Sequence, residues 1–156
     1  MSAELVFMMG NFEASFPTDR LYAKNHMWAL PSGGPASEPE FRFGLTAYAV
    51  RLLQDVYFLD LTIEAGMALK SKQEIGSIES KKAESSLYTP TAGRVTQINS
   101  SLIDDPTAIN LDKYGAGWMF ELTTSESGFL TPQQYIEHLQ AAWEVAQRTI
   151  KGQVNA

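Results

Sequence analysis

Hydrophobic residues along this chain fall mainly into short runs of the kind that form β-strands. Residues 56–61 are rich in β-branched and aromatic side chains and predict a buried strand. In residues 118–122 the large apolar groups Trp118, Phe120 and Leu122 recur at every second position, which places them on one face of another strand. This pattern predicts a mainly β fold. Glycines separate the runs at points where strands would bend or turn, namely Gly44, Gly66, Gly76 and Gly93.

Two short helices are predicted between the strands. One follows Thr46, whose hydroxyl can cap it, because Ala49, Val50 and Leu53 then occur at helical spacing. The other is predicted to start with Asp105 as its cap and Pro106 at its first position, where proline is tolerated.

The clearest helix lies at the C-terminus, over residues 131–150. Thr131 and Gln134 form a capping-box pattern, and Pro132 occupies the first helical position. At ~1.5 Å per residue the helix would be ~30 Å long. We expect it to pack on the rest of the chain, with a partner surface or a dimer contact as the alternative. The apolar positions that recur on one face are Ile136, Leu139, Trp143, Ala146 and Ile150.

Composition narrows the class of protein. A chain of 156 residues that is 44% hydrophobic can bury one core, and the absence of cysteine excludes disulfides and thiolate catalysis. A net charge of -6 argues against nucleic acid as a partner. The apolar stretch at residues 5–9 is too short for a signal peptide, and no run approaches the ~20 apolar residues of a membrane helix.

We expect no catalytic or metal site in this chain. His26 and His138 occur in unrelated contexts, and no nucleophile, base and orienting group are spaced in a recognisable way. Residues 31–40 are rich in Pro, Gly and Ser and predict a loop, without the flanking strand and helix that a phosphate-binding loop needs. The glycines of residues 115–117 likewise indicate a tight turn.

One polar segment, residues 78–90, carries two adjacent lysines between runs that can pair as strands. Lys81 and Lys82 would lie at the tip of the resulting hairpin, and Pro90 and then Gly93 follow it. An enzyme that attaches a prosthetic group needs a lysine presented in this way. Most lysines in polar turns are simply solvated, so the pattern alone does not assign a function.

The same segment resembles the lipoyl-attachment hairpin of the glycine cleavage system H-protein family, with its pattern E-S-V-K-A, a short polar stretch, L-Y and P. Residues 43–49 resemble the family's V-G-I-T-x-Y-A, residues 114–118 its Y-G-x-G-W ending, and His26 with Trp28 its H-x-W opening. The similarity runs from residue 24 to residue 123 with the motifs in the family's order. The hairpin residues at matching positions are Glu79, Ser80, Lys82, Ala83, Leu87, Tyr88 and Pro90.

The resemblance implies a flattened, lipoyl-domain-like barrel-sandwich hybrid with short flanking helices and a C-terminal helix. We expect an N-terminal extension at residues 1–23, a lipoyl-carrier domain at 24–123 and a helical segment at 124–156 packed on it. The resemblance further implies that Lys82 carries lipoate through an amide, as N6-lipoyllysine, which takes the net charge from -6 to about -7. The chain would then be a carrier without an active site of its own.

The partners implied by the resemblance belong to one multienzyme system. They are glycine decarboxylase (P protein), aminomethyltransferase (T protein), dihydrolipoyl dehydrogenase (L protein) and a lipoate-attaching enzyme. The carrier would shuttle the aminomethyl intermediate among them in the cytoplasm, or in the mitochondrion of a eukaryote. Glu74, Glu79 and Glu84 are expected close to the hairpin tip, where they would steer basic partners or only keep the hairpin soluble.

Some positions depart from the family pattern. Lys81 stands where a small apolar residue is usual, and Met27 replaces an acidic residue between His26 and Trp28. A biotinyl carrier is disfavoured, because its Met-Lys-Met context is absent. The departures leave two alternatives: a lipoate carrier of a heterodisulfide-reductase-like sulfur-oxidation system, and an unmodified paralogue with a binding role.

Overall fold

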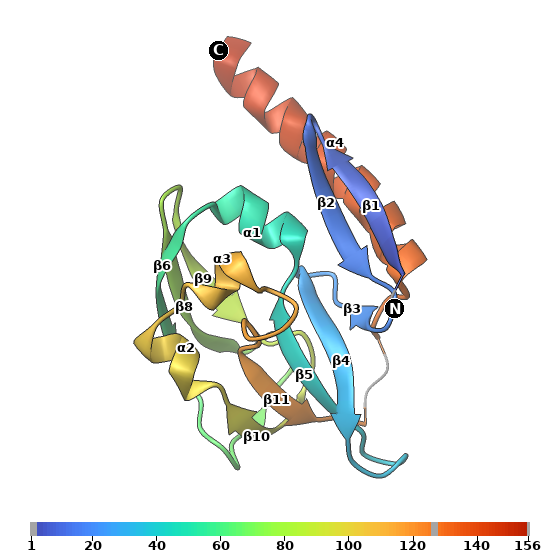
Figure 1. Cartoon of the computed structure of the whole chain (residues 1–156), viewed down its shortest axis with the longest axis vertical. Coiled ribbons are helices and arrows are strands. Elements are labelled where there is room, and N and C mark those ends of the chain that lie inside the picture. The colour runs from blue at the N-terminus through green and yellow to red at the C-terminus, as the bar shows by residue number, and fades with distance from the viewer. Residues whose placement is uncertain (1–2, 126–127, 156) are drawn as a thin grey trace.

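The computed structural model describes residues 3–125 and 128–155, which form three β-sheets flanked by helices (Figure 1). The largest sheet has six strands in the order β3-β4-β5-β11-β10-β7, and its neighbours are antiparallel throughout. Its strands are β3 (Leu21–Tyr22), β4 (Met27–Gly33), β5 (Glu40–Leu45), β7 (Ala68–Leu69), β10 (Gly93–Ile98) and β11 (Phe120–Thr123).

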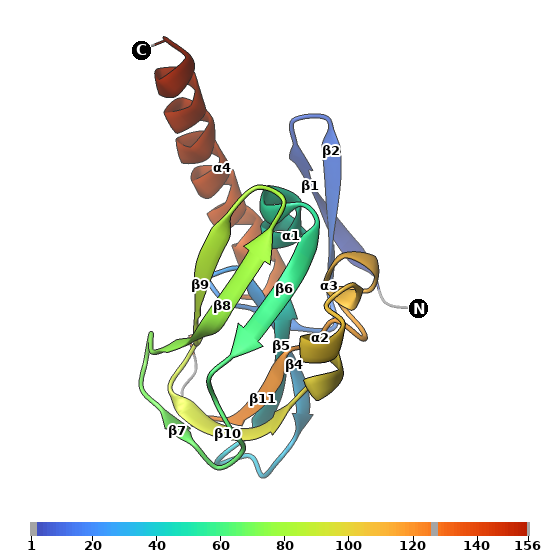
Figure 2. The same cartoon turned by 90° about the vertical axis from the view of Figure 1, so that its left-hand side faces the viewer.

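A second sheet of three strands faces the viewer in Figure 2, in the order β6-β8-β9. Strands β8 and β9 form an antiparallel hairpin, and β6 pairs with the other edge of β8. These strands are β6 (Val56–Leu61), β8 (Glu74–Ser80) and β9 (Glu84–Tyr88).

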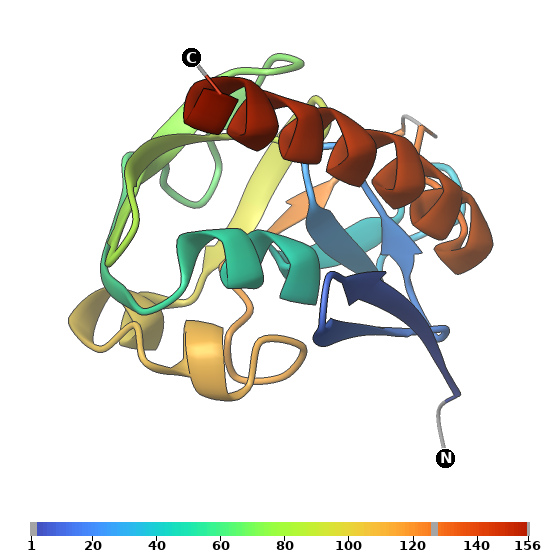
Figure 3. The same ribbon diagram turned by 90° about the horizontal axis from the view of Figure 1, so that it is seen from above.

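The third sheet is the N-terminal hairpin of β1 (Glu4–Met9) and β2 (Phe12–Pro17). It lies against the long C-terminal helix α4 (Pro132–Asn155), which extends beyond it in Figure 1. Seen from above, α4 runs across the molecule and the short helix α1 (Ala47–Leu53) lies below it (Figure 3). Two shorter helices, α2 (Ser100–Asp104) and α3 (Ala108–Leu111), lie beside the β6 edge of the three-stranded sheet (Figure 2).

The core has two parts. The larger part is aliphatic and aromatic and fills the space between the six-stranded and three-stranded sheets, with Phe43, Ile78 and Leu122 fully buried. The smaller part lies beneath α4 and the N-terminal hairpin, and we call it the aromatic layer. Its aromatic members are Phe7, Phe16, Tyr22, Trp28, Tyr48 and Tyr135.

Close contact between strands explains one glycine of the sequence pattern. A Cβ on Gly44 in β5 would lie only 2.5 Å from the ring of Trp28 in the neighbouring strand β4. Trp28 is fully buried, and its indole nitrogen donates to the carbonyl oxygen of Lys113 at 2.9 Å. Glycine therefore allows a large aromatic ring to lie flat across the adjacent backbone.

The mainly β prediction is confirmed, as is the C-terminal helix. The capping box forms in full: the Thr131 backbone N–H donates to the Gln134 side chain at 2.9 Å, and the Gln134 N–H donates to the Thr131 hydroxyl at 3.2 Å. Ile136 and Leu139 are buried on the predicted face, and Trp143 is partly buried. The side chain of Ile150 lies outside the described residues. The helix after Thr46 is also confirmed.

Several details of the prediction were wrong. The fold class is as predicted, but over residues 3–125 and 128–155 the sheets are open at their edges rather than closed into a barrel. No helix starts at Pro106: residues up to Asp104 form α2, and the Asp105 carboxylate accepts from the N–H and hydroxyl of Thr107 just before α3. The predicted loop at 31–40 is shorter, because residues 31–33 continue β4.

The strands predicted at 56–61 and 118–122 both exist, but the first differs from the prediction in burial and the second in its bounds. The strand at 56–61 exists but is only partly buried: Val56 and Leu59 lie in the core, whereas a bulge between Val56 and Phe58 leaves Tyr57 63% and Phe58 44% exposed. The strand predicted at 118–122 runs instead from Phe120 to Thr123, and Trp118 precedes it.

Candidate functional site: the β8–β9 hairpin tip

The hairpin tip is a three-residue connection between Ser80 and Glu84, and Lys82 is its central residue. Glu79 and Glu84 are the last pair in the strand register before the turn. Lys81 and Lys82 are both exposed, and neither amine has an ion-pair partner among the described residues. The tip therefore presents two free amines to solvent.

The turn is closed by the side chain of Ser80, which is 5% exposed. Its hydroxyl donates to the carbonyl oxygen of Ala83 at 3.0 Å and accepts from the N–H groups of Ala83 at 3.1 Å and Lys82 at 3.3 Å. The backbone adds a bond from the Ser80 N–H to the Ala83 carbonyl at 2.9 Å. Because the Ser80 hydroxyl satisfies three backbone groups of the turn, it fixes the backbone conformation at Lys82.

The tip is also attached to the body of the molecule. The Lys81 N–H donates to the carbonyl oxygen of Asp55 at 2.9 Å, which links the turn to the segment leading into β6. That segment is held in turn by Asn110, whose side chain accepts from the Val56 N–H at 2.9 Å and donates to the Gln54 carbonyl at 2.8 Å. The hairpin tip is therefore a braced structure, and no local pattern in the sequence indicates this bracing.

An apolar groove of about 210 Å³ lies between the hairpin and α1. It begins beside Ser85, whose Cα partner Ile78 is one step from the Glu79–Glu84 pair at the tip. One wall of the groove is thus formed by the hairpin that presents Lys82. Its lining includes Ala49, Leu52 and Leu53 of α1, Ser86 and Leu87 of β9, and His26.

The end of the groove at His26 is tied to helix α4. His26 Nδ1 lies 2.9 Å from the Tyr135 hydroxyl, which lies 2.9 Å from the hydroxyl of Thr46. The rings of His26 and His138 have centroids 5.7 Å apart, so the interpretation of the two histidines as unrelated was wrong. The neighbour was not visible in the sequence because α4 folds back over the residues near His26.

Burial lowers the pKa of His26 to about 4, and the nearby His138 adds to this effect. His26 is therefore uncharged at neutral pH. Burial raises the pKa of Tyr135 far above its ordinary value, so its hydroxyl keeps its proton. The groove ends in neutral polar groups rather than in a charge.

One predicted tip residue lies elsewhere. Glu74 is paired with Tyr88 at the opposite end of the hairpin, so only Glu79 and Glu84 flank Lys82. Among the described residues, no group of three or more His, Asp or Glu side chains could hold a metal ion. Within the same residues, no helix combines the length and apolar character needed to cross a bilayer.

Comparison with known proteins places these features in a family. The family model described as "Glycine cleavage H-protein" matches residues 20–148, which is most of the chain. The chain belongs to the glycine cleavage H-protein family. Proteins of this family are carriers rather than enzymes, and the family is one that carries lipoate.

Individual relatives agree. The chain is 38% identical over 128 residues to the glycine cleavage system H protein of Rubrobacter xylanophilus, which covers 81% of this chain and 97% of the relative. It is 37% identical over 114 residues to the H protein of Thermus thermophilus, covering 73% and 84%. The crystal structure of the H protein from Mycobacterium marinum superposes with a TM-score of 0.70 at 33% identity, covering 80% of this chain and 99% of that one.

Proposed function

We propose that this protein is a lipoyl carrier that passes the aminomethyl group between the enzymes of glycine cleavage in the cytoplasm, with lipoate attached to Lys82. The observation that carries the proposal is the braced turn, which holds Lys82 at the tip of an exposed hairpin in a chain of this family. Glycine decarboxylase, aminomethyltransferase and dihydrolipoyl dehydrogenase are then its partners, together with the enzyme that attaches lipoate.

The residues present fit this group. An amide can form at the Lys82 amine because the side chain is exposed and no described residue pairs with it. Once attached, lipoate supplies a dithiolane disulfide for redox and group transfer. The hydrogen bonds between the Ser80 hydroxyl and the backbone hold the attachment point in place. The apolar groove begins beside Ser85 in the same hairpin, near the point where the arm is attached.

Lys82 is proposed over Lys81 for a structural reason. The Ser80 hydroxyl accepts from the Lys82 N–H, whereas the Lys81 N–H is bound to the carbonyl oxygen of Asp55. The two side chains therefore leave a fixed backbone at different points, and an enzyme that recognises the turn can distinguish them.

The test is lipoylation of the purified protein by a lipoate ligase, followed by peptide mass spectrometry. Wild type and Lys81→Arg are expected to be modified at residue 82, and Lys82→Arg is expected to remain unmodified. Modification that survives in Lys82→Arg and is lost in Lys81→Arg would contradict the assignment of the site.

The partner system needs a second measurement. Lipoylated wild-type protein is expected to support exchange of carbon dioxide with the carboxyl group of glycine when glycine decarboxylase is added, and Lys82→Arg taken through the same lipoylation reaction is not. A fully lipoylated protein that supports no exchange would refute the role in glycine cleavage while leaving Lys82 as the attachment site.

A further inference from the structure

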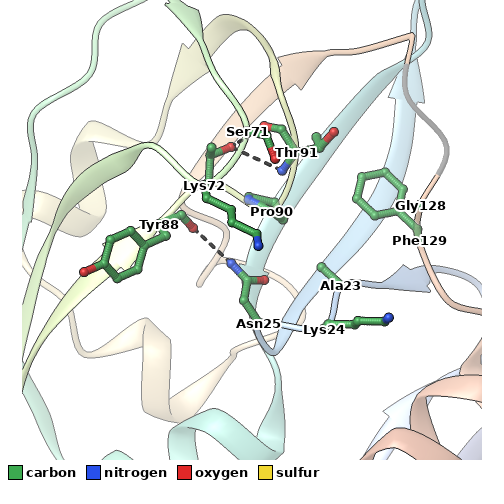
Figure 4. Close-up of a pocket in the computed structure, with 11 residues that line it drawn as sticks. Ala23, Lys24, Asn25, Ser71, Lys72, Tyr88, Pro90, Thr91, Gly128 and Phe129 are labelled. Atoms are coloured by element: carbon green, nitrogen blue, oxygen red, sulfur yellow. Dashed lines mark hydrogen bonds between the residues drawn. The ribbon is translucent and has the colours of Figure 1, made fainter.

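A second hollow, which adjoins the groove at Asn25 and Tyr88, opens at the base of the β8–β9 hairpin (Figure 4). Its volume of about 550 Å³ is within the range of small-molecule sites. Four segments far apart in sequence form its walls: the β3–β4 turn, the β7–β8 turn, the end of β9, and the residues before α4. The lining residues are Ala23, Lys24, Asn25, Ser71, Lys72, Tyr88, Thr89, Pro90, Thr91, Gly128 and Phe129.

Lys72 enters this hollow from a strained backbone position. It lies in the turn in which the Gln73 N–H donates to the Lys70 carbonyl at 3.1 Å, and its φ is +63°. This left-handed conformation costs a lysine free energy that glycine would not lose. Figure 4 shows the side chain lying across the hollow with its amine toward Asn25. Lys72 thus occupies a position whose backbone conformation favours glycine.

The hollow concentrates positive charge on an acidic protein. Lys24 and Lys72 come from different turns, and no Asp or Glu is among the residues that line the hollow, although the chain carries a net charge of -6. Within the described ranges neither amine has an ion pair; the ion pairs there join Arg20 to Asp19 and Arg42 to Glu121. Two amines without partners beside one cavity favour an anion.

The rest of the lining is mainly apolar and fixed in place. The ring of Phe129 packs on Phe41 with centroids 5.2 Å apart and so forms a rigid wall. The side chain of Asn25 is held by a hydrogen bond from its Nδ2 to the Tyr88 carbonyl at 3.0 Å. The Thr89 hydroxyl donates to the Thr91 carbonyl at 2.6 Å. The polar selectivity of the hollow therefore rests on its two lysines.

We propose that this hollow binds a small organic anion, with a phosphate or carboxylate group on the amine of Lys72, a flat apolar body against Phe129, and Lys24 adding positive charge from another wall. The site is independent of the lipoate attachment point, because its lining shares no residue with the turn at 80–84. The proposal therefore stands or falls separately from the carrier function.

The experiment is a titration of the full-length protein followed by amide chemical shifts in ¹H–¹⁵N spectra. Phenyl phosphate and benzoate are expected to shift the amides of Lys72 and Asn25 saturably, and inorganic phosphate and phenol are expected to bind more weakly than phenyl phosphate. Binding should weaken as salt is raised from ~20 mM to ~200 mM, because the amines are partly solvated.

Variants separate a built site from general attraction. Lys72→Gly is expected to fold with a melting temperature no lower than that of wild type, because it relieves the left-handed lysine, and to weaken phenyl phosphate binding about tenfold or more. Lys70→Ala makes the same change in net charge in the same turn but does not line the hollow, so it should bind like wild type. Equal binding by Lys72→Gly and wild type, equal losses in both variants, phenol binding as tightly as phenyl phosphate, or no saturable shift would each overturn the proposal.

Discussion

The hairpin tip and the aromatic layer are built in opposite ways. At the tip, one serine hydroxyl and a few backbone bonds, including the one from the Lys81 N–H to the Asp55 carbonyl, hold an exposed lysine. In the aromatic layer, rings from β2, β3 and α4 meet: Tyr22 stacks on Tyr135 at 4.8 Å, and Phe16 meets the Tyr135 ring edge-on at 5.4 Å. Presentation of the lysine and stability of the fold therefore depend on separate residues, so they should respond to separate mutations.

The largest effect is expected in the aromatic layer. Phe16→Ala removes a fully buried ring that packs on both tyrosines, so it should lower the free energy of unfolding by ~3–5 kcal/mol. Denaturant unfolding followed by fluorescence would measure this loss. Lys82→Ala is the matched control, because the exposed lysine should leave stability within ~0.5 kcal/mol of wild type. A cost below ~1 kcal/mol for Phe16→Ala would show that the layer contributes little.

A smaller loss of stability is expected when the pH is lowered. It depends on His26, which lies at the end of the groove beside the Tyr135 hydroxyl. The unfolded state binds a proton at His26 near pH 6.5, whereas the folded state does so only near pH 4. Between these values the unfolded state holds more protons, so stability falls as pH drops from 6.5 to 4 and is independent of this group above that window. The full loss is at most ~3 kcal/mol.

The check for this prediction is unfolding at a series of pH values. His26→Gln should have a shallower slope between pH 4 and 6.5 than wild type, because the titrating group is gone. His138→Gln should produce a smaller change, since His138 is the secondary cause of the lowered pKa of His26. Identical slopes in wild type and His26→Gln would assign the acid sensitivity to other groups.

Removal of the Ser80 hydroxyl is expected to lower the free energy of unfolding modestly and to slow lipoylation clearly. Ser80→Ala leaves two N–H groups of the turn without their acceptor, which should cost ~1–2 kcal/mol. The rate of lipoylation at low protein concentration should fall by more than the lost stability alone would explain, because the turn is no longer fixed. Ser85→Ala is the control, since within the described part of the chain the Ser85 hydroxyl donates to the carbonyl oxygen of the neighbouring Ser86 and takes no part in closing the turn. Unchanged lipoylation kinetics in Ser80→Ala would mean that the enzyme does not need the braced turn.

The smallest effect concerns the charges around the tip. Glu79→Gln and Glu84→Gln are expected to raise the apparent KM of partner enzymes for the lipoylated carrier a few-fold at low salt and to have little effect at high salt. Glu74→Gln makes the same charge change at the far end of the hairpin and should have a weaker effect. If all three variants match wild type at every ionic strength, the glutamates serve only solubility.

The contrast between the locally built hairpin tip and the aromatic layer, which joins distant segments, also explains which features could be predicted from the sequence. The capping box of α4 and the cap at Thr46 depend on residues three apart, so local patterns suffice. The location of Lys82 at the tip could be predicted because the hairpin motif is contiguous. Burial across the fold could not be predicted in this way. The bulge that exposes Tyr57 depends on pairing with β8, and the approach of His138 to His26 depends on where α4 docks.

The two lysines of the basal hollow illustrate the same limit. Nothing in the sequence around Lys24 or Lys72 marks them as neighbours of one cavity, because the turns that carry them meet only through the sheets. The left-handed backbone at Lys72 likewise follows from the geometry of its turn. Such sites become visible only once the strands are paired.

The bond between the Lys81 N–H and the Asp55 carbonyl has a consequence for motion. It makes the base of a lipoyl arm on Lys82 a stationary pivot, so the volume that the arm can search is set by its own bonds and not by swinging of the hairpin. A reactive group confined to so small a volume has a high effective concentration for an enzyme docked beside the tip and none for an enzyme beyond its reach. On the proposed function, partner enzymes would therefore have to dock one after another beside the hairpin tip.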